Sequence, residues 1–142
     1  LHNCGLDSAG TAYCWGMNSG RIGDGTGTDR PTPTAALMPL GVTFTSLVAG
    51  YDGTCGLTPA GMAYCWGRNH LGQVGDGTGT SRYEPSAVVM PAGESFTTIT
   101  AGWRYACGLA PRGAAYCWGL NNHGQLGDGT TTNRLAPVEV VQ

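Results

Sequence analysis

Six cysteines are the residues of this 142-residue chain whose spacing most directly predicts chemistry. They form three pairs ten residues apart, which are Cys4 with Cys14, Cys55 with Cys65, and Cys107 with Cys117. Such pairs form disulfides, remain as small buried thiols, or bind a metal. Zinc is disfavoured because each pair lacks a second Cys or His pair at ligand spacing. We expect disulfides, with six buried thiols as the alternative.

An acidic residue recurs in a Gly-Asp-Gly-Thr tetrapeptide, and an arginine follows it six residues later. The pairs are Asp24 and Arg30, Asp76 and Arg82, and Asp128 and Arg134. Loops of this kind can supply calcium ligands, but a calcium loop needs several oxygen ligands and each repeat offers one such carboxylate. We therefore expect each aspartate to accept hydrogen bonds from its own turn and to pair with its arginine. We expect no metal and no cofactor.

Histidines give little support for catalysis. His2, His70 and His123 fall at different positions of the repeats. None has a serine nucleophile or a carboxylate at a recognisable catalytic spacing. The sequence therefore predicts a protein that is not an enzyme.

These residues lie in a unit that occurs three times. Cys-Gly-Leu begins at residues 4, 55 and 107, and Tyr-Cys-Trp-Gly begins at 13, 64 and 116. Self-similarity at a fixed period is typical of repeat architectures. We predict a single segment, 1–142, with repeats at 1–54, 55–106 and 107–142, the last one incomplete.

Each repeat is predicted to consist of strands and turns. Residues 44–50 and 96–102 alternate apolar and hydroxyl side chains, as a half-buried strand does. A hairpin follows in which Cys55 faces Cys65, Leu57 faces Ala63, and a glycine takes a positive φ in the loop (Gly10, Gly61 and Gly113). Apolar residues at 86–90 and 137–141 indicate a fourth strand.

This hairpin register bears on the compartment of the protein. The Cα atoms of a non-hydrogen-bonded antiparallel pair lie about 4.5 Å apart, at the short end of disulfide reach. Each bridge closes a short loop, worth roughly 2.5–3 kcal/mol in the chain-entropy model. Disulfides persist in oxidising compartments, so we expect a secreted or cell-surface protein.

A four-stranded sheet cannot bury both faces alone, and radial stacking of such sheets gives a β-propeller. The run Cys-Gly-Leu, Tyr-Cys-Trp-Gly-x-Asn, Gly-Gln-x-Gly-Asp-Gly-Thr, Arg resembles the regulator of chromosome condensation repeat in its bacterial, cysteine-bearing style. The resemblance implies an all-β propeller that typically closes seven blades. Three repeats are too few to close a propeller. We therefore expect either a fragment of a longer propeller or self-association through open blade edges.

Tryptophan recurs at one position of every repeat, at Trp15, Trp66 and Trp118. We expect these three side chains to pack between blades, with each indole N–H bonded to backbone.

Positions that vary between otherwise matching repeats are the candidate binding residues, because loops carry function on a fixed scaffold. One set follows each Ala-Gly and the other follows each Trp-Gly; together they are Tyr51, Asp52, Trp103, Arg104, Tyr105, Arg68, His70, Asn122 and His123. Aromatic residues and arginine are typical of binding hot spots.

Composition narrows the classes of partner. The net charge is −2, and all seven basic residues are arginine. The sequence has no basic cluster of the kind that binds nucleic acid. It also has no apolar run long enough to insert into a membrane. The sequence thus predicts a secreted or cell-surface, non-enzymatic module that binds a protein or glycan through loops. The alternatives are a self-assembling structural repeat protein in a ring or filament and, less favoured, an inhibitor of a secreted enzyme.

Overall fold

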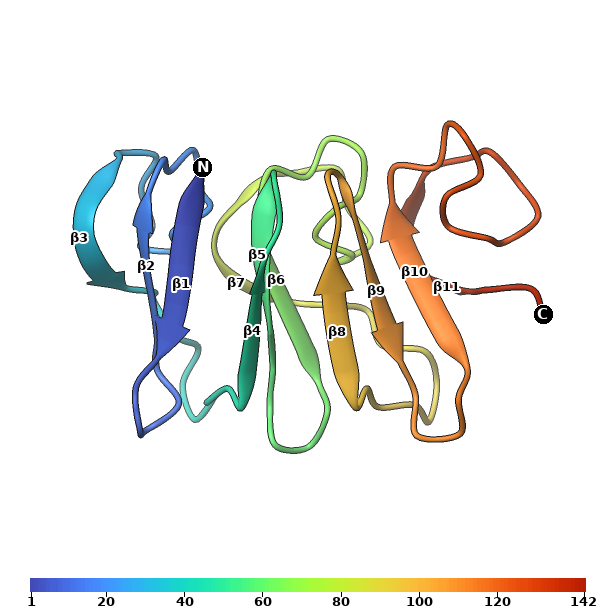
Figure 1. Ribbon diagram of the computed structural model, residues 1–142, viewed down its shortest axis with the longest axis horizontal. Coiled ribbons are helices and arrows are strands. Elements are labelled where there is room, and N and C mark those ends of the chain that lie inside the picture. Colours follow the sequence, from blue (N-terminus) through green and yellow to red (C-terminus); the bar gives the residue numbers. More distant parts are fainter.

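Strands and connecting loops account for the whole computed structural model, which describes residues 1–142. The strands form three antiparallel sheets that stand side by side in chain order (Figure 1). The first sheet contains β1 (His2–Leu6), β2 (Ala12–Gly16) and β3 (Arg30–Ala35). The second contains β4 (Ser46–Ala49), β5 (Gly53–Leu57), β6 (Ala63–Gly67) and β7 (Arg82–Ala87). The third contains β8 (Thr98–Ala101), β9 (Tyr105–Leu109), β10 (Ala115–Gly119) and β11 (Arg134–Glu139).

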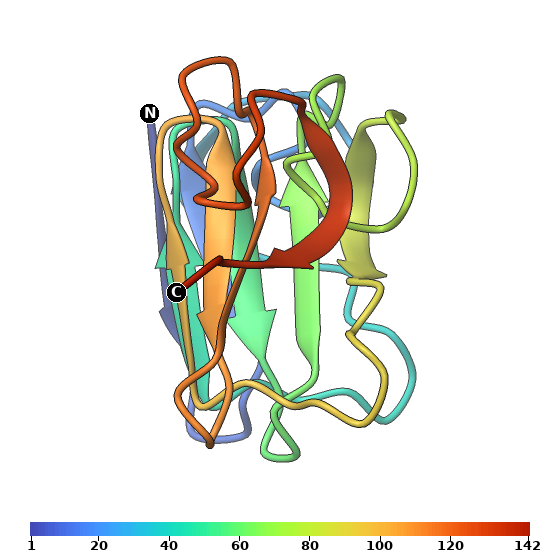
Figure 2. The same cartoon turned by 90° about the vertical axis from the view of Figure 1, so that its right-hand side faces the viewer.

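We call each sheet with its loops a blade. Viewed end-on, the blades lie one behind another with their strands aligned (Figure 2). The all-β blade architecture predicted from the repeats is thus confirmed. The chain has no helix of the length and apolarity that a membrane crossing requires. Counted by sheet, the second and third blades begin at β4 and β8, one strand before the first cysteine of each predicted repeat.

The central hairpin has the predicted register in every blade. Cys55 pairs with Cys65 and Leu57 pairs with Ala63 in the second blade.

Disulfides join the two cysteines of every hairpin, as predicted. The Cα–Cα distance is 4.1 Å in each bridge, and the bridges join Cys4 to Cys14, Cys55 to Cys65, and Cys107 to Cys117. The alternative of free buried thiols is therefore excluded in this structure. The three bridges do not share one environment, because Cys14, Cys55, Cys65 and Cys117 are buried while Cys4 and Cys107 are half-buried.

The fourth strand begins three to four residues earlier than predicted and ends two to three residues earlier. It covers Arg82–Ala87 and Arg134–Glu139, rather than 86–90 and 137–141. Its start is fixed where the arginine that pairs with Asp76 lies opposite Gly67. The apolar residues then leave the ladder, where Val88 becomes buried and the Val89 amide donates to the Gly75 carbonyl. The end of the apolar run in the second blade therefore marks core contact, whereas in the third blade Val138 still pairs with Cys117.

The hydrophobic core is divided between the two blade junctions. One cluster, between the first and second blades, is formed by Ala12, Cys14, Ile22, Ala36, Phe44 and Trp66. The other, between the second and third blades, is formed by Cys55, Leu57, Ala63, Cys65, Val74, Val88, Phe96, Ala106 and Trp118. Phe44 stacks on Trp66 at 5.9 Å and Phe96 stacks on Trp118 at 6.0 Å between ring centroids. The blades are thus held together by burial of apolar surface.

Hydrogen bonds across the junctions repeat in the same way. The Trp66 indole donates to the Arg21 carbonyl at 2.9 Å, and the Trp118 indole donates to the Gln73 carbonyl at 3.1 Å. Each indole therefore bonds to the backbone of the preceding blade, which satisfies its buried N–H. Trp15, at the matching position of the first blade, is half-buried.

Candidate functional site

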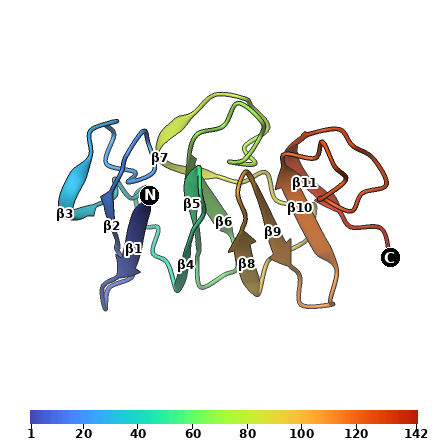
Figure 3. The same cartoon turned by 45° about the horizontal axis from the view of Figure 1, so that its top comes forward.

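The long loops gather at one end of the blades. In an antiparallel sheet successive connections alternate ends, so the β4–β5 and β6–β7 loops share an end opposite the β5–β6 hairpin. The same holds for the third blade, and these loops lie at the upper end in Figure 1 and come forward in Figure 3. We call this end the loop face. Both sets of variable positions predicted from the sequence belong to it.

A buried asparagine holds each long loop in shape. Asn18, Asn69 and Asn121 are fully buried. In the second blade the Asn69 carboxamide donates to the Asp76 carboxylate and the Thr80 carbonyl, and accepts from the Val74 amide at 2.9 Å. One side chain thus replaces the backbone partners that a loop of this length lacks.

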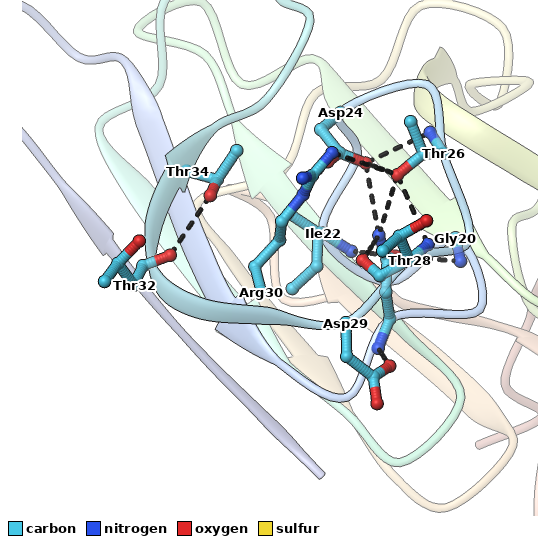
Figure 4. Close-up of polar contacts among 10 residues, drawn as sticks. Gly20, Ile22, Asp24, Thr26, Thr28, Asp29, Arg30, Thr32 and Thr34 are labelled. Carbon is cyan, nitrogen blue, oxygen red and sulfur yellow. Dashed lines mark hydrogen bonds and ion pairs between the residues drawn. The ribbon is translucent and has the colours of Figure 1, made fainter.

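The aspartate of each Gly-Asp-Gly-Thr loop is fully engaged within its own loop, and Figure 4 shows the first of these loops, with Asp24. Asp24 accepts from the Thr26 amide at 3.0 Å and the Thr26 hydroxyl at 2.8 Å, and pairs with Arg30 at 2.5 Å. Asp76 pairs with Arg82 at 2.5 Å and Asp128 pairs with Arg134 at 2.6 Å. No group of three or more His, Cys, Asp or Glu side chains is placed to hold a metal ion.

These contacts shift the acidity of the aspartates. Burial opposes ionisation of Asp24 and Asp76, but hydrogen bonds from Thr26 or Thr78 and from the paired arginine outweigh it, so both pKa values are lowered. The hydrogen bond from Thr130, with Arg134, lowers the pKa of Asp128 to about 2. All three carboxylates therefore stay ionised at neutral pH as structural anions.

Asp52, on the loop between β4 and β5, is a second kind of buried carboxylate. It is 2% exposed and contacts one arginine from each blade. Its oxygens lie 3.4 Å from Nη2 of Arg21, 3.8 Å from Nη1 of Arg68 and 3.2 Å from Nε of Arg104. The Gln73 side-chain carboxamide also donates to the Asp52 carboxylate at 3.3 Å. A single negative charge thus joins three positive ones and links all three blades.

Arg21 differs from the other two arginines because its contacts are internal. It is 3% exposed and donates to the carbonyls of Asn18 and Tyr51 at 2.8 and 2.9 Å. The side chains of Arg68 and Arg104 remain 44% and 28% exposed. The surface next to Asp52 is therefore positively charged.

An aromatic pair flanks these arginines. Tyr51 and Trp103 are 44% and 54% exposed, with ring centroids 5.8 Å apart. The Arg104 guanidinium lies 4.2 Å from the centre of the Trp103 ring, which is a cation–π contact. We call Tyr51, Arg68, Trp103 and Arg104 the Arg–Trp surface.

The Arg–Trp surface has almost no cavity beneath its arginines. The cavity between Arg68, Trp103 and Arg104 measures about 20 Å³. A cavity of that volume holds about one water molecule. The surface is thus a shallow contact area rather than a substrate pocket.

The structure brings together five of the nine predicted binding residues: Tyr51, Asp52, Arg68, Trp103 and Arg104. Asp52 is enclosed, so it orders its neighbours rather than meeting a partner itself. Tyr105 is half-buried, with its ring packed against the Gly102 backbone. His70, Asn122 and His123 are exposed elsewhere on the long loops, and Asn122 bonds to His123 at 2.8 Å.

The sequence did not reveal the role of the buried asparagines or the ion pair of Arg21. The buried asparagines lie in the repeated Trp-Gly-x-Asn motif, so their recurrence was the available signal. Arg21 stands where Gln73 and Gln125 occur in the other repeats; Gln73 also contacts Asp52, but only the arginine at this position forms an ion pair with it.

Two family models match parts of this chain. One, described as the regulator of chromosome condensation (RCC1) repeat, matches residues 60–109 and 112–142. A second model of the same description matches residues 44–73 and 96–125. Together they cover hairpins and long loops of the second and third blades.

Two curated relatives illustrate the range of similar proteins. The probable E3 ubiquitin-protein ligase HERC4 of Homo sapiens is 30% identical over 99% of this chain and 14% of its own length. The ultraviolet-B receptor UVR8 of Arabidopsis thaliana is 31% identical over 96% of this chain and 31% of its own length. The chain thus spans less than a third of either relative.

Solved structures give the same fold. Prp20p from Saccharomyces cerevisiae, described with its binding to Gsp1p and histones, has a TM-score of 0.86 and 22% identity over 99% of this chain and 36% of that one. The ectodomain of the receptor kinase CR4 from Physcomitrella patens has a TM-score of 0.54 and 30% identity over 85% of this chain and 27% of that one.

Proposed function

This chain belongs to the regulator of chromosome condensation (RCC1) repeat family. We propose that it is a non-catalytic module which binds a protein outside the cell through its loop face. The observation that carries the proposal is the Arg–Trp surface, where exposed aromatic rings and arginines are held together by Asp52. Such residues dominate protein-binding hot spots. We take 1–142 as one propeller segment with the three repeats predicted above.

An oxidising location is supported by the three disulfides, because such bonds persist outside the reducing cytosol. The similarity to a receptor-kinase ectodomain points the same way. Secretion or display at the cell surface is therefore part of the proposal. A glycan partner, or a secreted enzyme held by the same loops, would use the same surface.

Site-specific photo-crosslinking tests the proposal. A photoreactive phenylalanine derivative is placed at Tyr51, on the loop face, or at Met62, an exposed control in the β5–β6 hairpin at the opposite end. Incubation with the extracellular fraction of the source cells should yield a discrete protein adduct from position 51 and none from position 62. No adduct at position 51, or the same adduct from both, would contradict the proposal.

Self-association through blade edges is the second candidate. At the two junctions the Phe44 and Phe96 amides donate to the carbonyls of Gly10 and Gly61, at 2.9 and 2.8 Å. Gly113, at the matching position of the third blade, is exposed and borders an open hollow of about 590 Å³. A further blade, from the same polypeptide or from a second copy, fits against this side.

Light scattering of the non-reduced chain across a tenfold concentration range distinguishes these sources. A defined dimer or larger species supports self-association. A monomer that unfolds cooperatively excludes self-association for this segment and shows that its three blades are stable by themselves.

A further inference from the structure

We propose that the Arg–Trp surface recognises an acidic peptide segment of the partner protein. A carboxylate of that segment binds at Arg68 and Arg104, and a neighbouring apolar side chain packs on Tyr51 and Trp103. This inference rests on the proposed function and specifies the chemistry of the partner.

The charge around Asp52 favours an acidic partner. Arg21, Arg68 and Arg104 form ion pairs with Asp52 and with no other carboxylate. Three positive charges against one negative charge leave a local excess of two positive charges, although the whole chain has a net charge of −2. Because Asp52 is enclosed while Arg68 and Arg104 are partly exposed, a partner meets the positive charge directly. A segment bearing Asp or Glu complements this surface.

The surface is held in place before a partner binds. The Arg104 guanidinium lies between the Trp103 ring, 4.2 Å from the ring centre, and the Asp52 carboxylate, 3.2 Å from Nε; this buried Nε makes no hydrogen bond. The Arg68 amide donates to the Asp52 carbonyl at 2.9 Å, which anchors the start of the long loop. Arg104, whose guanidinium is already placed by these contacts, loses less side-chain entropy on binding, so more of its charge attraction contributes to affinity.

The aromatic pair favours a peptide over a simple polyanion as the partner. Tyr51 and Trp103 expose adjoining rings beside the arginines, so the surface combines apolar and charged contacts. A nucleic acid backbone needs several basic contacts along its length. This surface offers two exposed arginines in a chain without lysine. An acidic peptide with an apolar residue matches both parts.

Selection from a random peptide library displayed on phage tests the inference on the whole non-reduced chain. Peptides retained by the protein should be enriched in Asp and Glu next to an aromatic or aliphatic residue. Retention should fall for the Arg68→Gln and Trp103→Ala variants. Arg112→Gln is the matched control, since it removes an exposed arginine with no ion pair from the β9–β10 hairpin at the opposite end.

Fluorescence anisotropy then measures one enriched peptide and its Glu→Gln counterpart. Each loss, of the peptide carboxylates or of Arg68, should weaken binding by about fivefold or more, equivalent to about 1 kcal/mol. Binding should also weaken as salt rises from about 0.05 to about 0.5 M, because exposed charges are screened. The Arg112→Gln variant should bind as the unchanged protein does.

Several outcomes would overturn the inference. These are an absence of acidic enrichment, equal retention by the Arg68→Gln variant, or binding of heparin and single-stranded DNA in place of the peptide. If any occurs while the crosslink from position 51 persists, the acidic-partner inference fails and the protein-binding proposal survives. Unchanged near-ultraviolet circular dichroism of each variant shows that folding is not the cause.

Discussion

Buried polar side chains replace backbone pairing in the long loops of this molecule. Asn121, fully buried, donates to the Asp128 carboxylate and two carbonyls and accepts from the Leu126 amide. Asp52 likewise compensates three arginines from three blades. An unpaired buried polar group is costly, so these residues fix the loops that carry the Arg–Trp surface.

Asn121→Ala should lower the free energy of unfolding by more than about 2 kcal/mol, because it leaves several buried groups without partners. The neighbouring Asn122→Ala is the matched control, since Asn122 is exposed and should change stability by less than about 0.5 kcal/mol. Urea unfolding of both variants measures the difference. Equal effects would show that the buried carboxamide does not hold the loop.

His2 should make stability fall with acid. Burial, then the charges of Arg21 and the amino terminus, lowers the pKa of His2 from 6.5 to about 4. The folded state therefore disfavours the proton that the unfolded chain accepts, so stability is complete above pH 6.5 and declines from there toward pH 4. The loss reaches at most about 3 kcal/mol.

Unfolding measured across this pH range checks the expectation for His2. His2→Gln should flatten the profile, whereas His70→Gln, at an exposed position, should leave it unchanged. A profile that keeps its slope in His2→Gln would assign the acid sensitivity to another group.

The hairpin is the element that the sequence specifies most fully. Strands β5 and β6 are short, and their register places Cys55 opposite Cys65 within the core. The third blade repeats this arrangement, with Cys107 opposite Cys117. The disulfide, the paired strands and the positive φ of 78° at Gly61 agree with one another. Agreement between local preferences of this kind is typical of sequences that specify one structure.

Replacing both Cys55 and Cys65 with alanine should lower the free energy of unfolding by about 2.5–3 kcal/mol in the chain-entropy model. Cys4 and Cys14 have the same separation, so the matched double variant should lose a similar amount if loop entropy dominates. Denaturant unfolding without reductant measures both. A loss below about 1 kcal/mol for Cys55 and Cys65 would contradict this account.

At the scale of the whole molecule, stability depends on contacts between neighbouring blades. Each junction has its own apolar cluster, and a stacked phenylalanine and tryptophan lie at its centre. Stability of such an array approximates a sum of units and nearest-neighbour interfaces. Damage at one junction should therefore remain local.

Trp118→Ala should cost about 3–5 kcal/mol, because it removes a fully buried indole from the second junction. Hydrogen exchange should show protection lost in β8–β11 and retained in β1–β3. Trp103→Ala, on the loop face, is the control and should leave protection unchanged in every strand. Equal loss throughout the chain after Trp118→Ala would indicate one cooperative unit instead.

The sequence by itself determined the repeat, the all-β blades, the hairpin register and the cysteine pairing. These depend on contacts within about ten residues, where side-chain alternation and turn residues set the geometry. The fourth strand was placed a few residues too late because the end of its apolar run, at Val88 and Val89, lies beyond the ladder, where Val88 is buried.

Only the tertiary structure decided which loop residues form a surface. Arg21, Asp52 and Arg104 lie far apart in sequence, and they meet because the blades stack with their long loops at one end. Stacking depends on sheet twist and on side chains of both partners, which no single repeat encodes. Variation among repeats identified Tyr51, Arg68 and Trp103 as candidates, while blade packing placed them around the buried carboxylate of Asp52.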